Sequence, residues 1–581
     1  MKKIIIFCVV LSLLATGLVW WLAPSRFPKP SKRQLEEVAG EVVLEGEWNK
    51  SPVIDPVDSE LAYARTTTGG RALFLMNIKT GAERRFSNRN EIAHPCGYSP
   101  DGRFLLFDDV LTYADRIMLS DRSHPPDGPY AEGRMDNISW VSSNSFCFSY
   151  RGTNFGQLIT LTPSAIQTNR FDTGMSVYGM TPVRPNQVAW IRNSGICLLD
   201  VATGHHEDLT LENHEISACW SDTYAPEWFT YSPQNNEFLF CSWDKSDWRH
   251  LYRLTKENQG WSFEQETKGG EHSYNGRWIQ NGKGFAFIGN RTNHFYLAIR
   301  PDEQKGATNL FAGGHVFGYT VSWNGDTIYA IGSIGAEPLG IWEYTISSRT
   351  LRYVGGRAKL SQAEPIPREE HWVSSFDGTK VPYYLLTPKN LEKRKKHPAI
   401  IFLPIWGMQN FPAWEMFSQF FANIGVFHVA VNHRGIDGYG KAYKEWGVTD
   451  ADKDVEAVYQ DIVKTPNIDT SRIFLMTYSE AAIVANEVIE HYPGQWAGVI
   501  NIAGVPPPRE QVQTQRMRVF LFVGDQDTAE IKSDVMFFES WAAANNVKAH
   551  VLHSDKTRHI ITSTEVDKKL LLALANFVFE N

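Results

Sequence analysis

An internal repeat in the first 360 residues constrains the fold of this chain more than any other feature. Each unit reads as a polar turn, a short apolar strand and a second strand about ten residues later. The first strands contain, in chain order, Leu61, Phe104, Phe146, Val188, Phe238, Phe285 and Ile328. Successive anchors are 42 to 50 residues apart, and Gly, Asn, Asp or Pro occupies most of the preceding turns.

A period of this length, built from short strands, is typical of β-propeller blades. One four-stranded sheet cannot bury both of its faces, whereas a ring of blades covers every face and protects the sheet edges. Seven units fit between residues 45 and 360, so we expect a seven-bladed propeller. A pair of β-sandwiches with accidental spacing is the alternative.

The pattern changes after the polar linker from Gly355 to Glu370. Near-continuous apolar strands then alternate with amphipathic helical stretches, which indicates a parallel sheet covered on both faces. The expected strands lie at 399–403, 427–431, 473–476, 498–502 and 519–523, and the expected helices at 413–424, 452–463, 482–491 and 533–545. We therefore predict a doubly wound α/β domain over residues 365–581.

Three polar residues of this domain each follow a predicted strand. Ser479 lies between a strand and a helical run, Asp527 follows a later strand, and His559 follows the last one. The order Ser, Asp, His is that of α/β-hydrolases, and carboxyl ends of strands are where open α/β sheets place their sites. Histidine can take the serine proton near neutral pH, and a carboxylate fixes its tautomer. Asp525 and His553 are the competing candidates for acid and base.

Several motifs resemble the prolyl oligopeptidase family of serine peptidases, whose members join a propeller to an α/β-hydrolase domain. Residues 434–440 read Arg-Gly-Ile-Asp-Gly-Tyr-Gly, which is similar to the family signature Arg-Gly-Ser-x-Gly-Tyr-Gly, and Asp454 resembles the aspartate beyond it. Residues 375–378, Ser-Phe-Asp-Gly, resemble the family's entry into its catalytic domain. We interpret Arg434 as a structural ion-pair residue.

The segment around the serine departs from the family pattern. The family has Gly-x-Ser-x-Gly-Gly, whereas residues 477–482 read Thr-Tyr-Ser-Glu-Ala-Ala. The resemblance implies an oxyanion hole near the end of the first core strand, where residues 404–408 read Pro-Ile-Trp-Gly-Met and lack the family's tyrosine donor. The backbone N–H groups of Trp406 and Glu480 are the remaining candidates.

The N-terminus predicts a membrane segment. Lys2 and Lys3 precede an apolar run from Ile4 to Ala23, which matches the roughly 20 residues that cross a bilayer. We expect residues 1–33 to be an uncleaved signal anchor, with a cleaved signal peptide as the alternative, and the catalytic part to be extracytoplasmic.

Composition argues against several other classes of protein. A net charge of −8 argues against nucleic-acid binding, and neither a disulfide framework nor metal-ligand spacing is visible. The resemblance implies a serine hydrolase that cleaves short peptides without a cofactor, with the propeller limiting substrate size. An esterase using the same residues, and an inactive relative whose propeller binds a partner, are the alternatives; oligomeric state stays open.

Overall fold

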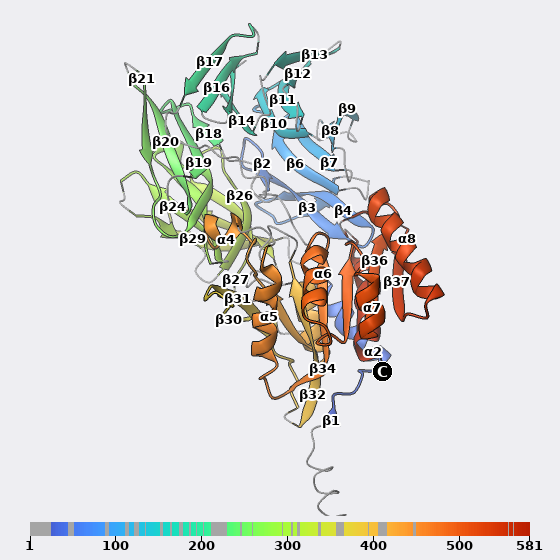
Figure 1. Ribbon diagram of the computed structural model, residues 1–581. Coiled ribbons are helices and arrows are strands. Elements are labelled where there is room, and N and C mark those ends of the chain that lie inside the picture. The colour runs from blue at the N-terminus through green and yellow to red at the C-terminus, as the bar shows by residue number, and fades with distance from the viewer. Residues whose placement is uncertain are drawn as a thin grey trace, which may run out of the picture.

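The computed structural model has two domains, a β-propeller and an α/β domain, stacked against each other (Figure 1). It describes residues 25–580 except for 44–51, 87–91, 111–114, 121–126, 134, 151–154, 163–164, 173–177, 185–186, 193–194, 202, 211–228, 244–246, 258–259, 293, 304–305, 311–313, 335–338, 356–364, 393, 405–414, 446–448, 556, 560 and 562.

The described residues between 53 and 355 form seven four-stranded sheets, each hydrogen-bonded in chain order, and this confirms the seven-bladed propeller. The blades are β2 (Val53–Ile54), β3 (Glu60–Thr67), β4 (Gly70–Asn77), β5 (Glu83–Arg85); β6 (Ile92–Tyr98), β7 (Leu105–Val110), β8 (Asp115–Ser120), β9 (Asp127–Gly133); β10 (Met135–Ser142), β11 (Ser145–Tyr150), β12 (Phe155–Leu161), β13 (Ile166–Asp172); β14 (Tyr178–Arg184), β15 (Gln187–Arg192), β16 (Gly195–Asp200), β17 (His206–Thr210); β18 (Phe229–Ser232), β19 (Glu237–Trp243), β20 (Arg249–Glu257), β21 (Gly260–Gln265); β22 (His272–Trp278), β23 (Gly284–Arg291), β24 (His294–Pro301), β25 (Thr308–Asn309); and β26 (Gly314–Val321), β27 (Thr327–Ile334), β28 (Gly340–Thr345), β29 (Thr350–Gly355).

The turn between the first two strands of a blade follows from its sequence. In the second blade the Ser99 hydroxyl accepts the N–H of Phe104 at 2.9 Å, and Gly102 has a φ of 71°. The seventh blade repeats this geometry, because Ser322 caps the residue five positions on and Gly325 has a φ of 75°. A serine acceptor and a glycine in the left-handed region are what a tight hairpin of this kind requires.

Hydrophobic clusters join each blade to the next. Cys147 and Cys197, for example, lie together in the buried cluster between the third and fourth blades, as expected for thiols that act as small hydrophobes. One cluster contains side chains of the seventh blade and of the first, and the Trp323 N–H donates to the Asp58 carboxylate across the same boundary at 3.1 Å. The ring is thus closed between its last and first blades.

The α/β domain is a largely parallel sheet in the order β30-β31-β33-β32-β34-β35-β36-β37, with β1 beside β32. Its strands are β30 (Glu369–Ser374), β31 (Lys380–Leu386), β32 (Lys395–Leu403), β33 (Phe427–Val431), β34 (Ile468–Tyr478), β35 (Gly498–Ile502), β36 (Arg518–Gly524) and β37 (Ala549–Ser554). Its helices are α3 (Met416–Asn423), α4 (Lys441–Glu445), α5 (Ala451–Ile462), α6 (Ala481–His491), α7 (Arg509–Gln515), α8 (Ala529–Ala544) and α9 (Thr564–Phe579).

Side chains of successive strand residues enter two different cores. In β34, Ile473 and Leu475 lie in the core with α5, α6 and α8, whereas Phe474 and Met476 lie in the core with α3 and α9. Strands buried on both faces therefore need continuous apolar sequence, which is the pattern that predicted the domain.

The first described residues precede the propeller in sequence but lie on the α/β domain. β1 (Ser25–Arg26) pairs in parallel with the beginning of β32, and the ring of Phe27 stacks on His397 with 4.4 Å between centroids. α2 (Lys32–Val42) starts at the capping residue Ser31 and packs on α9 and α3. The expected limit of the membrane segment at residue 33 thus falls inside a segment that the α/β domain holds.

Residues 1–24, which contain the apolar run, lie outside the described residues. In the part of the chain that the structure does describe, no helix is long and apolar enough to cross a bilayer.

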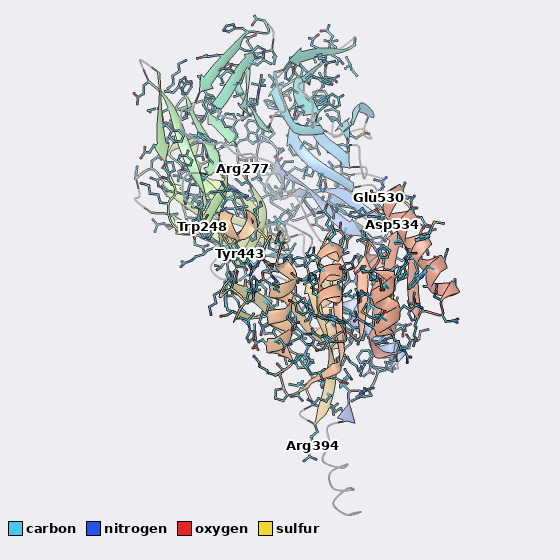
Figure 2. The ribbon with its side chains drawn as sticks, in the orientation of Figure 1. Trp248, Arg277, Arg394, Tyr443, Glu530 and Asp534 are labelled. Atoms are coloured by element: carbon cyan, nitrogen blue, oxygen red, sulfur yellow. The ribbon has the colours of Figure 1, made fainter. Side chains whose placement is uncertain are left out.

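A buried ion pair connects the two domains. Asp437 of the α/β domain accepts from the guanidinium of Arg249 of the propeller at 3.3 Å, and Lys444 lies 3.2 Å from the same carboxylate oxygen. Nearby, the Lys441 N–H donates to the carbonyl of Asp247 at 2.8 Å. Figure 2 labels Trp248 and Tyr443, from the two domains, at this boundary.

Candidate active site

Ser479 occupies a sharp turn between β34 and α6. Its φ is 56°, a left-handed conformation that is rare for a residue other than glycine. The turn is held because the Ser479 N–H donates to the carbonyl of Ile502 at 2.8 Å and the Ala482 N–H donates to the carbonyl of Ser479 at 3.1 Å. A strained serine between a strand and a helix is the geometry of a nucleophile elbow.

The neighbouring sheet strand accommodates the unusual residues of this turn. The buried hydroxyl of Thr477 donates to the Asn501 side chain at 2.8 Å, and the Asn501 amide donates to the carbonyl of Val505 at 2.7 Å. Gly504 leaves the space, since a Cβ at that position would lie 2.7 Å from the Ser479 carbonyl oxygen. The sequence analysis did not single out Asn501 or Gly504, because their role depends on the pairing of β34 with β35.

The structure brings Ser479, His559 and Asp527 into one hydrogen-bonded chain. The Ser479 Oγ lies 2.7 Å from His559 Nε2, and His559 Nδ1 lies 3.0 Å from Asp527 Oδ1. A carboxylate can only accept, so Nδ1 carries the proton and Nε2 is left to accept the proton of the serine. The Asp527 side chain is fully buried, whereas the imidazole is 26% exposed.

Backbone hydrogen bonds of two loops fix the relative position of the Asp527 carboxylate and the His559 imidazole. The Gln526 N–H donates to the carbonyl of Thr557 at 3.1 Å, and the Thr528 N–H donates to Asp527 Oδ1 at 2.7 Å. At Gly524 a Cβ would collide with the Thr557 carbonyl, so only glycine allows the end of β36 to approach the loop so closely.

The competing candidates lie outside this chain of hydrogen bonds. Asp525 and His553 are both about half exposed and face each other at 3.8 Å, and His553 also lies 3.3 Å from Glu539. Surface ion pairs of this kind are worth little energetically.

The Glu480 backbone N–H lies next to Ser479, at the N-cap position of the eleven-residue helix α6. The first N–H groups of a helix have no partner within it and carry partial positive charge, which suits them to an oxyanion. The other expected donor, Trp406, lies outside the described residues.

Arg434 takes part in an ion-pair cluster that ties the signature motif to the beginning of the domain. Its guanidinium donates to Asp454 at 2.7 Å and 2.9 Å and to Asp377 at 3.0 Å and 3.3 Å. The Ser375 hydroxyl donates to Asp454 at 2.6 Å. Hydrogen bonding to Arg434 lowers the pKa of the Asp377 carboxyl below its usual range. The Arg434 side chain thus pairs with two carboxylates, as expected for a structural ion-pair residue.

Over the described residues, no group of three or more His, Cys, Asp or Glu side chains is placed to hold a metal ion.

Known proteins resemble the chain locally in sequence and throughout in fold. No family model matches it. A stretch of 157 residues, 26% of the chain, is 26% identical to dipeptidyl-peptidase 5 of Porphyromonas gingivalis, and covers 23% of that protein. The puromycin-hydrolysing peptidase of Mycobacterium tuberculosis superposes with a TM-score of 0.70 at 14% identity, over 96% of this chain and 98% of that one.

A solved prolyl endopeptidase superposes with a TM-score of 0.73 at 12% identity, over 95% of this chain and 92% of that one. At such identities the superpositions establish the fold. The curated relative is matched over less than a quarter of its length, so its activity does not transfer by sequence alone.

Proposed function

We propose that the chain is a serine hydrolase that cleaves short peptides, as its resemblance to the prolyl oligopeptidase family implies. The local sequence match to a dipeptidyl-peptidase and the nearly full-length likeness of the fold to solved peptidases support this proposal. Ser479 is the nucleophile, His559 the general base and acid, and Asp527 the residue that orients the imidazole. The observation that carries the proposal is the chain of contacts from Ser479 Oγ to His559 at 2.7 Å and on to Asp527 at 3.0 Å.

The reaction follows from these contacts. Ser479 Oγ attacks the scissile carbonyl while its proton passes to His559 Nε2, and the buried Asp527 carboxylate stabilises the imidazolium. The imidazolium then gives the proton to the leaving amine, which breaks the C–N bond and leaves an acyl-enzyme. A water molecule, deprotonated by the same nitrogen, hydrolyses the ester and restores Ser479.

The tetrahedral oxyanion needs donors on the side of the turn where α6 begins. We assign one to the Glu480 N–H, at the start of α6. Trp406, the second donor that the family resemblance implies, lies outside the described residues. One missing donor typically costs about 10² to 10³ in kcat, so an oxyanion hole without a tyrosine hydroxyl is compatible with activity.

The propeller lies over the edge of the sheet at which Ser479, Asp527 and His559 are found (Figure 1). The Ser563 hydroxyl, four residues beyond His559, donates to the carbonyl of Thr68 in the first blade at 2.6 Å. Such a cover restricts access, which supports short peptides rather than folded proteins as substrates.

The test is reaction of the full-length, detergent-solubilised chain with a fluorophosphonate probe, beside Ser479→Ala. A shorter chain that begins at residue 34 is unsuitable, because it lacks β1 and Ser31, the residue that caps α2. Labelling that disappears in the variant supports an activated Ser479. Absence of labelling on a folded wild-type chain contradicts the hydrolase mechanism and favours the binding-scaffold alternative. A panel of matched peptides and esters then separates peptidase from esterase.

We also propose that residues 4–23 anchor the chain in a membrane, with the catalytic part extracytoplasmic. β1 pairs with the amino end of β32, whereas Ser479, Asp527 and His559 follow the carboxyl ends of β34, β36 and β37 in the same parallel part of the sheet, so β1 lies at the edge opposite the proposed active site. Arg394, next to that end, lies far from the propeller in Figure 2. Mass measurement of the mature N-terminus and protease protection in sealed vesicles test the anchor and its side.

A further inference from the structure

The residue before the nucleophile contacts the loop that carries the base. The Tyr478 hydroxyl donates to the carbonyl of His559 at 2.9 Å and accepts the N–H of Ile561 at 3.2 Å. One hydroxyl thus bonds both a carbonyl and an amide of the same loop. Its ring packs against the core that also contains α3 and α9.

We propose that Tyr478 is a positioning residue that sets the distance between the base and the nucleophile. This inference rests on the proposed function of Ser479 and His559 and deepens it. Tyr478 and Ser479 are consecutive, so a single turn of chain fixes both the attacking oxygen and the attachment point of the histidine loop.

The physical need for such an attachment comes from the location of His559. It lies in a loop after β37, and loops are more mobile than the elements they connect. Tyr478, by contrast, is the last residue of β34 and pairs with Ile502 of β35. A side chain on a rigid strand holds a site more accurately than a loop does by itself.

The chemistry of the contact selects tyrosine. The hydroxyl must donate to one backbone group and accept from another at the same time, and a phenol does both. Phenylalanine preserves the ring and its packing but loses both hydrogen bonds, whereas tryptophan can only donate. Tyr478→Phe is therefore the variant that isolates the contact.

We expect Tyr478→Phe to lower the rate of fluorophosphonate labelling, and kcat on a peptide substrate, roughly fourfold to hundredfold, because each of the two lost hydrogen bonds is worth about a factor of 2 to 10. KM should change little, since both partners of the hydroxyl are backbone groups of the loop that carries His559. The pH profile of kcat/KM should also differ from that of the wild type, because a displaced imidazole no longer meets Ser479 and Asp527 at the distances of 2.7 Å and 3.0 Å. A purely structural role would leave that profile unchanged.

Tyr383→Phe is the matched control. Its hydroxyl donates to Asp461 at 2.8 Å on the part of the sheet formed by β31, and β34 is not involved. Removing it also costs one tyrosine hydroxyl in the same domain, so it should reproduce any general loss of stability while leaving labelling rate and pH profile unchanged.

Hydrogen exchange at the Ile561 amide, read by mass spectrometry with electron-transfer fragmentation, gives a second result that does not depend on activity. Faster exchange in Tyr478→Phe than in wild type and in Tyr383→Phe supports the inference. If labelling, pH profile and Ile561 exchange all match the wild type, the inference is wrong while the proposed function stands. If wild-type Ser479 does not react at all, the proposed function fails instead.

Discussion

Removing the charge of Asp437 should weaken the contact between the two domains. In Asp437→Asn the guanidinium of Arg249, whose side chain is 1% exposed, loses the carboxylate 3.3 Å away. Breaking a buried ion pair by deleting one partner costs about 3–5 kcal/mol. Lys444 is 21% exposed and can turn toward water, so losing its contact with Asp437 adds little to this cost. We therefore expect the lower end of that range.

The cost falls on domain docking, because separation of the domains would let water solvate Arg249. About 3 kcal/mol corresponds to roughly a hundredfold shift of the docking equilibrium. The assay is hydrogen exchange at the Lys441 amide, which donates across the interface to Asp247. Its exchange should accelerate by up to that factor in Asp437→Asn, while amides of the blade cores should keep their rates.

Two further variants make the reasoning refutable. Asp525→Asn removes an exposed carboxylate 3.8 Å from His553, so it should leave exchange at Lys441 unchanged. The double variant Asp437→Asn, Arg249→Met also removes the buried guanidinium, and most of the loss should be recovered. Unchanged exchange in Asp437→Asn, or a double variant worse than the single one, would refute the argument.

Acid should weaken the same contact. Burial lowers the pKa of His272 from 6.5 to about 3. As the pH falls below 6.5, His272 is therefore protonated when the domains are apart and stays neutral when they are docked, so acid favours separation. Burial alone would raise the pKa of the Asp437 carboxyl, but Arg249 and Lys444 outweigh it and hold the pKa below its usual range. The stabilisation of docking by the Asp437 carboxylate is thus complete above about pH 4 and is lost progressively as the pH falls further. Radii of gyration measured by small-angle scattering from pH 7 down to about pH 2 should show the wild type opening as the pH falls, and its difference from Asp437→Asn should shrink only below about pH 4.

Three other predictions concern the triad and its support. Asp527→Asn should lower kcat roughly 10⁴-fold with little change in KM, because an amide can stabilise the wrong imidazole tautomer; steady-state kinetics on a folded variant test this. Thr477→Val should lower the free energy of unfolding by about 1–3 kcal/mol, since it leaves a buried amide oxygen without the hydroxyl donor, and urea denaturation measures it. Gly524→Ala should abolish probe labelling, because its methyl group collides with the Thr557 carbonyl and displaces the loop of His559, whereas Gly40→Ala, with nothing within 4 Å, should label normally.

The sequence predicted most of the architecture because the deciding interactions are local or periodic. Blade strands follow from apolar runs between turns such as that of Ser99, where a capping hydroxyl and a glycine are close in sequence. The α/β domain follows from strands like β34, whose consecutive apolar residues must face two cores. Ser479, Asp527 and His559 could be selected because each follows a strand of that sheet, although their contact was only inferred from order.

The spacing of residues in the sequence did not predict contacts between residues that are far apart in the chain. Asn501 satisfies the awkward Thr477 only because β34 and β35 are neighbours in this register. Arg249 and Asp437 are 188 residues apart, and neither is distinguishable from a surface charge until the domains meet.

The N-terminal segment and Tyr478 illustrate the same limit. β1 reaches β32 across the whole propeller in sequence, and Tyr478 meets the histidine loop more than 80 residues later. Hydrophobic period and turn chemistry depend on neighbouring residues, so the sequence alone determines the blades, the sheet and the order of Ser479, Asp527 and His559. Which polar group meets which partner depends on distances that exist only after both cores have packed, and that is what the tertiary structure decided.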